Sequence, residues 1–170
     1  GISHAELRLS NGLPVLMEVA TRLPGDGITF LWELATGQPV EPVMVDLALG
    51  IPTSFPKPRR RARQAYVDHP FGRLRDVVST TADVHWVERD DRWPTPRPVP
   101  ADAPAGARSV LVTQQPGTLL GPQIDSEQRS ASVMFDAPLD EPTAPLVERF
   151  LDQVTVLVEA DDHEHQEAAS

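Results

Sequence analysis

The pattern of apolar and polar residues at the start of the chain predicts a β-hairpin over residues 4–20. Two short runs rich in leucine, valine and methionine, at 5–9 and 15–19, flank the turn signal Ser10-Asn11-Gly12. A three-residue loop at 11–13 sets the register of the two strands. In that register Glu6 lies directly opposite Glu18, so both carboxylates fall on one face of the hairpin.

Two carboxylates facing each other destabilise a sheet unless a positive charge neutralises them. A hard divalent cation held by carboxylate oxygens is one interpretation, and Mg²⁺ at a phosphate site is the usual case. The other interpretation is that one glutamate points to solvent or pairs with Arg8 or Arg22. The pattern alone leaves both interpretations open.

Apolar residues with the spacing of a helix follow the hairpin. Apolar positions recur with a helical period over 28–36, between Asp26, which is a good N-cap, and Gly37, which is a typical residue just past a helix end. Pro39 suits the first turn of a second helix that stops at Gly50. A hairpin and two helices are therefore expected in the first part of the chain.

A second unit is expected after the proline-rich boundary at 51–58. We predict an α+β fold with the division 1–56 and 57–159, a proline-rich surface loop at 89–108, and a disordered polar tail at 160–170. The predicted strands are 60–67, 84–88, 109–114, 130–135 and 154–158, and the predicted helices are 71–78 and 141–151.

Composition narrows the class of protein. Fifteen basic and twenty-five acidic residues give a net charge of −10, which argues against nucleic acid as a partner. The absence of cysteine excludes disulfides and thiolate metal sites. No apolar run is long enough to cross a membrane, and no secretory leader opens the sequence, so we expect a cytoplasmic protein without a membrane partner.

The first residues suggest that the chain is incomplete. The sequence does not begin with Met and enters a strand at once, and such a strand needs neighbours. We therefore expect the C-terminal part of a longer polypeptide, or one half of a split one.

The residues after the hairpin complete a candidate site. Arg22 lies four residues beyond Glu18, where it can reach an anion that is also bound to a metal. Gly25 and Gly27 allow backbone N–H groups to approach a ligand, and the helix N-terminus that follows favours negative charge. Carboxylates, a guanidinium and a helix N-terminus suit phosphoryl transfer. The alternative is an ordinary strand–loop–helix connection.

Four motifs stand out along the chain: Gly1-Ile-Ser-His4-Ala-Glu6, Glu18-Val-Ala20-Thr-Arg22-Leu-Pro-Gly25-Asp26, Ala35-Thr36-Gly37 and the pattern Gln115-Pro-Gly117 with Ser126 and Arg129. By the first three, residues 1–50 resemble the end of the ATP-grasp domain of carboxylate–amine ligases, and most closely the L-amino-acid ligase branch. By the fourth, residues 59–158 resemble, less specifically, the small C-terminal domain of the same ligases. One departure is Ala20, because many members have Asn there as a further metal ligand.

The resemblance implies a role for each matched residue. Glu6 and Glu18 would bind the Mg²⁺ (or Mn²⁺) that holds ATP, and Arg22 would contact the substrate carboxylate and its acyl phosphate. Gly25 and Asp26 would shape the loop over that intermediate. His4 would be a neighbour of the same pocket.

The resemblance also implies partners. The substrates would be a small carboxylate and an amine, such as amino acids, and the chain would need an N-terminal ATP-grasp lobe or a homodimer partner. ATP-gripping lysines belong to that lobe, since the sole lysine here is Lys57. A non-catalytic fragment, a split-ligase subunit and a binding module built on 59–158 remain as alternatives.

Four arginines, Arg59, Arg60, Arg61 and Arg63, stand close together after the proline-rich boundary. A nucleic-acid patch is one interpretation, but the net charge and the lack of interleaved aromatic residues oppose it. We expect a solvated strand edge that pairs with acidic neighbours.

Overall fold

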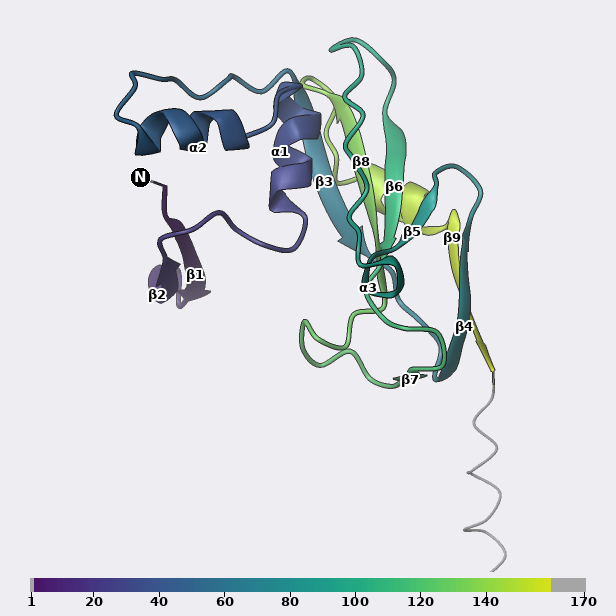
Figure 1. The fold of residues 1–170 in the computed structure, drawn as a ribbon. Helices are drawn as coiled ribbons and strands as arrows, with labels where there is room; N and C mark the ends of the chain where they lie inside the picture. Colours follow the sequence, from purple (N-terminus) through teal and green to yellow (C-terminus); the bar gives the residue numbers. More distant parts are fainter. Residues whose placement is uncertain (1, 160–170) are drawn as a thin grey trace, which may run out of the picture.

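A computed structural model describes residues 2–159, so the predictions for the tail at 160–170 lie outside the described residues. The fold is α+β, as predicted, with a hairpin that stands apart from two larger sheets (Figure 1). The elements are β1 (His4–Ser10), β2 (Leu13–Ala20), α1 (Ile28–Thr36), α2 (Glu41–Ala48), β3 (Arg60–Tyr66), β4 (Gly72–Ser79), β5 (Val84–Trp86), α3 (Val87–Asp90), β6 (Gly106–Val112), β7 (Leu119–Leu120), β8 (Ala131–Pro138), α4 (Leu146–Leu151) and β9 (Val154–Glu159).

The hairpin turns through two residues, not three. Asn11 and Gly12 both have positive φ, 51° and 78°, as a type I′ turn requires. Ser10 therefore pairs with Leu13, and the predicted three-residue loop is wrong. A register shift after Glu6 leaves one residue of β2 without an opposite partner and brings Glu6 back opposite Glu18, so that the predicted pairing is confirmed.

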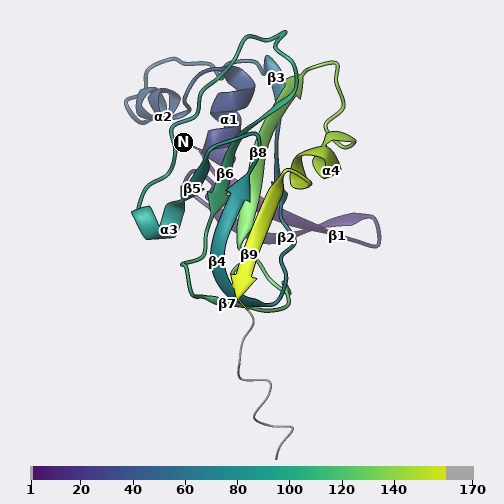
Figure 2. The ribbon, with the colours of Figure 1, turned by 90° about the vertical axis from the view of Figure 1, so that its right-hand side faces the viewer.

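The main core lies between the two larger sheets. One has the strand order β3-β8-β6-β5 and the other β7-β4-β9 (Figure 2). Strand β8 is buried on both faces, and its residues Val133 and Phe135 contribute to this core. Leu74 from β4 and Phe150 from α4 pack into it as well, with the rings of Phe135 and Phe150 4.8 Å apart. This burial joins the later part of the chain into one unit.

Helix α1 covers the other face of the four-stranded sheet. Phe30 and Leu34 pack there against Leu111 of β6 and Met134 of β8. The end of α1 is tied to the start of β3, because the backbone N–H of Arg59 donates to the carbonyl of Ala35 at 2.7 Å. A helix from the first 56 residues thus packs on the sheet formed by later ones. The domain boundary itself stays a prediction.

Strand β4 replaces the helix predicted at 71–78. The apolar residues Phe71, Leu74, Val77 and Val78 have helical spacing, which is why the sequence pattern indicated a helix. A register shift between Leu74 and Asp76 explains this spacing. Core-facing residues in a strand are normally two positions apart, and the extra residue in β4 makes this spacing three. Both Leu74 and Val77 therefore face the core.

Helix starts also differ from the predictions. Gly27, not Asp26, is the N-cap of α1, and no side chain caps that helix. The second helix begins at Glu41 with a proline in its first turn, not at Pro39. The last helix begins only after Pro145, since prolines restrict the preceding segment. Gly37 ends α1 with φ of 77°, as predicted.

One member of the arginine cluster after the boundary departs from the predicted solvated edge. Arg59, Arg61 and Arg63 are exposed, and β3 is an edge strand of its sheet, as expected. The Arg60 side chain is fully buried and donates to Oδ1 of the buried Asp136 at 2.9 Å. It also donates to the carbonyls of Pro100, Ala101 and Ala103 at 2.7–3.0 Å. Arg108 reaches the same Asp136 oxygen at 2.6 Å. Arg60 therefore fastens the proline-rich segment to the sheet.

Glu33 on α1 provides a test of how the helix packs. Burial, and then the nearby Glu41, raise the pKa of its carboxyl. A raised pKa in the folded state means that ionised Glu33 opposes folding, and that this cost grows as the pH rises above the ordinary carboxyl value. We expect Glu33→Gln to raise the melting temperature at pH 7 and to have no effect near pH 3. Equal shifts at both pH values in calorimetry would contradict this.

Candidate functional site

The acidic pair lies on the hairpin with a basic group beside each member. Glu6 and Glu18 are more than half exposed, at 56% and 57%. His4 Nε2 lies 3.9 Å from Glu6 Oε1, and Arg22 Nη2 lies 3.8 Å from Glu18 Oε1. Both distances exceed hydrogen-bond length, so the carboxylate oxygens keep free coordination sites. The hairpin register thus brings four predicted site residues together.

The donor set fits a magnesium ion shared with a phosphate. Within residues 2–159 no group of three or more His, Asp or Glu side chains is placed to hold a metal ion on its own. Mg²⁺ in phosphate sites commonly uses one or two carboxylates, with waters and phosphate oxygens as its other ligands. Glu6 and Glu18 match that requirement. They do not match a fully protein-made metal cage.

The loop after Arg22 contains two glycines with different surroundings. A side chain at Gly25 would meet nothing within 4 Å, so this position is open. Gly27 has φ of 77°, and a Cβ there would overlap the end of the Met134 side chain. The Met134 side chain is flexible and could shift, so it is the positive φ that favours glycine at position 27. Of the two, only Gly25 is free to face a ligand.

Asp26 lines a cavity of about 240 Å³ at one end of the four-stranded sheet. The polar walls include Tyr66 of β3 and Arg129 of the loop before β8, whose guanidinium lies 3.9 Å from the Tyr66 ring centre. Gln64 donates to Ser132 Oγ at 3.0 Å on the same face. The predicted site residues are thus divided between the hairpin and this cavity.

Sequence reasoning did not identify this cavity as a site. Its walls come from β3, β6, β8 and α3, which only the folded sheet brings together. The one available signal was the motif that contains Ser126 and Arg129, because both residues line the cavity. That motif indicates a domain but not a ligand site.

The hairpin carries an apolar surface that the rest of the described chain does not cover. Seven of its large apolar side chains are 46–75% exposed: Leu7, Leu9, Leu13, Val15, Leu16, Met17 and Val19. A two-stranded hairpin is marginally stable by itself in water. Exposed apolar patches of this kind are typical of interaction surfaces. The acidic pair is thus carried by an element that is suited to packing against another surface.

Comparisons with known proteins identify the fold. The sequence matches no protein-family model and no curated protein sequence. The structure is similar to that of an L-amino acid ligase from Bacillus licheniformis, with a TM-score of 0.59 and 18% identity. It is also similar to a phosphoribosylglycinamide synthetase from Anaerococcus prevotii, with a TM-score of 0.58 and 7% identity.

Both matches span most of this chain and a smaller part of each ligase. In both cases the match covers 92% of this chain and 37% of the other. The chain therefore has an ATP-grasp-like fold and spans little more than a third of the length of either ligase.

Among the described residues, no helix has the length and apolar character needed to cross a membrane.

Proposed function

We propose that this chain is the C-terminal part of an ATP- and Mg²⁺-dependent ligase that joins a carboxylate to an amine through an acyl phosphate. The observation that carries the proposal is the register of the hairpin, which holds Glu6 opposite Glu18 with Arg22 beside Glu18. Opposed carboxylates are unfavourable in a sheet. Arg22 and His4 lie 3.8 and 3.9 Å from them, beyond hydrogen-bond length, so this arrangement still favours a cation bound directly to the oxygens. The sequence motifs around them support the same activity.

The chain's own residues would act by binding and by charge. Glu6 and Glu18 hold Mg²⁺, which when bound neutralises and orients the ATP phosphates. Arg22 binds the substrate carboxylate and stabilises the negative charge on the phosphoryl group as it is transferred. The open Gly25 leaves room for the intermediate next to the loop.

The proposed reaction has two bond-forming steps. A carboxylate oxygen attacks the γ-phosphorus of ATP, a new oxygen–phosphorus bond forms, and the bond to ADP breaks. The amine nitrogen then attacks the acyl carbon, phosphate leaves, and the nitrogen loses a proton. The products are an amide, ADP and phosphate. Residues outside this chain would grip the ATP.

A split-ligase subunit is a second candidate, and the exposed apolar surface of the hairpin favours it over a non-catalytic fragment. The two candidates differ in one measurement. A split subunit gains ATP turnover when the ATP-binding lobe is supplied as a separate chain, whereas a non-catalytic fragment does not.

Arg22→Ala tests the proposed function. In the ligase completed by its ATP-binding lobe, we expect acyl-phosphate formation, trapped with hydroxylamine as a hydroxamate, to fall by about 100-fold or more, because the charge that stabilises the transferring group is lost. Arg8→Ala is the matched control, since Arg8 is an exposed arginine of the same hairpin. Equal hydroxamate yields from the wild type and Arg22→Ala would refute the assigned role.

A further inference from the structure

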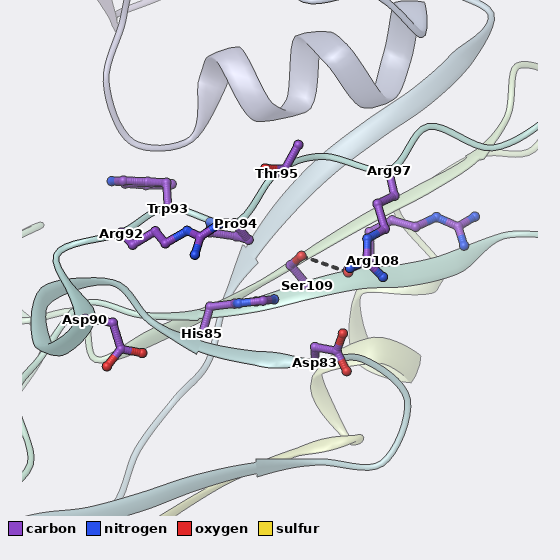
Figure 3. A pocket seen from close by; sticks show the side chains of 10 residues that line it. All are labelled: Asp83, His85, Asp90, Arg92, Trp93, Pro94, Thr95, Arg97, Arg108 and Ser109. Atoms are coloured by element: carbon purple, nitrogen blue, oxygen red, sulfur yellow. Dashed lines mark hydrogen bonds between the residues drawn. The ribbon is translucent and has the colours of Figure 1, made fainter.

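A second cavity, of about 380 Å³, lies between the edge of the four-stranded sheet and the proline-rich segment after α3 (Figure 3). His85 of β5 and Ser109 of β6 form its floor. Arg92 and Arg97 approach it from the segment above, and Trp93 lines the end of the cavity beside Arg92. The volume is within the range of small-molecule sites.

Two cations in this cavity have no acidic partner. Among residues 2–159, neither Arg92 nor Arg97 forms an ion pair, whereas Asp90 and Arg108 in the same wall are already engaged. Asp90 accepts two hydrogen bonds from Arg89, at 2.7 and 3.1 Å. Arg108 is bound to Asp136 at 2.6 Å. Asp83 is the remaining acid in the wall. The cavity is therefore locally basic in a chain with a net charge of −10.

The two free guanidinium groups are directed at the floor. Figure 3 shows Arg92 extending over His85 and Arg97 descending toward Ser109. Prolines at 94, 96, 98 and 100 restrict the backbone that carries them. The buried Arg60 also fixes the end of this segment, because its guanidinium donates to the carbonyls of Pro100, Ala101 and Ala103. This pre-organisation lowers the entropy cost of placing two arginines around one ligand.

We propose that this cavity binds a small phosphorylated molecule, with its phosphate or diphosphate between Arg92 and Arg97 and its organic part against Trp93. Guanidinium groups bind phosphate oxygens in paired hydrogen bonds, and two of them neutralise a dianion. The cavity is larger than a phosphate alone requires, and the 45% exposed Trp93 offers an apolar face for an attached group. This site is separate from the acidic pair and needs no metal.

Calorimetric titration of the chain with pyrophosphate and with ADP, in EDTA and about 50 mM salt, tests the proposal, because low salt limits screening of exposed charges. We expect saturable binding of both probes at one site, and at least about tenfold weaker binding in Arg92→Gln and in Arg97→Gln. Arg75→Gln, an exposed arginine of β4, is the matched control and should bind as the wild type does. Absence of saturable binding, or equal weakening by Arg75→Gln, would overturn the proposal.

Trp93→Ala tests whether the organic part of the ligand contacts Trp93, because pyrophosphate has no organic part and ADP has one. We expect this variant to weaken ADP binding and to leave pyrophosphate binding unchanged; the reverse result would overturn the placement of the organic part. The double variant Glu6→Gln/Glu18→Gln should bind both probes as the wild type does. Loss of binding in that variant would assign the anion to the hairpin instead, so this test fails or succeeds independently of the proposed ligase activity.

Discussion

Asp136→Asn is expected to lower the free energy of unfolding by about 3–5 kcal/mol, the usual cost of removing one partner from a buried ion pair. Asp136 and Arg60 are fully buried, and a single carboxylate oxygen accepts hydrogen bonds from both Arg60 and Arg108. Asparagine keeps the size of the side chain and removes its charge. Two guanidinium groups are then left close together without a counter-charge.

The effect is measured by urea denaturation, with Asp90→Asn as the control. Asp90 also pairs with an arginine, Arg89, but both side chains are 49% exposed. Water screens such a pair, so its loss should change stability little. A similar midpoint for both variants would show that burial does not set the strength of the Asp136 cluster. The slope of the transition should stay constant, since asparagine does not alter the area exposed on unfolding.

Glu6→Gln and Glu18→Gln are each expected to reduce Mg²⁺-dependent ATP turnover by about 100-fold or more in the ligase completed by its ATP-binding lobe. Each removes one of the two carboxylates that we propose hold the ion. Neither should destabilise the fold, because the substitution relieves repulsion between opposed like charges. Loss of activity without loss of stability is the signature of a site that is maintained for function.

A glutamate variant outside the hairpin and melting curves of the hairpin variants serve as controls. Glu148→Gln, an exposed glutamate of α4, should keep full ATP turnover. Circular dichroism melting curves should be unchanged or slightly higher for both hairpin variants. Normal ATP turnover in Glu6→Gln and Glu18→Gln would refute the metal assignment, whatever the melting curves show.

The pairing of Glu6 with Glu18 could be predicted because two local errors cancelled. The turn holds one residue fewer than expected, and the register shift after Glu6 adds one back. Asn11-Gly12 is a typical two-residue turn, so the turn could have been predicted correctly. The shift could not, because nothing in the apolar pattern of β2 marks it.

A register shift also explains why the helix predicted at 71–78 is wrong. One extra residue in β4 gave a strand the spacing of a helix, and only its pairing with β9 reveals the strand. Arg60 shows a different limit. Arginines are usually exposed, and the carbonyl groups that bury this one come from residues 100–103, forty positions away in the chain. Both cavities are likewise products of tertiary packing.

The exposed hairpin has a thermodynamic consequence for the acidic pair. The repulsion between Glu6 and Glu18 weakens the element whose apolar surface is uncovered. A cation bound between the carboxylates would remove that repulsion and would stabilise the hairpin in the conformation that another surface can pack against. By reciprocity, whatever packs on the apolar residues raises the affinity for the cation by the same factor. The cation and the surface that packs on the hairpin would thus both stabilise the same folded conformation.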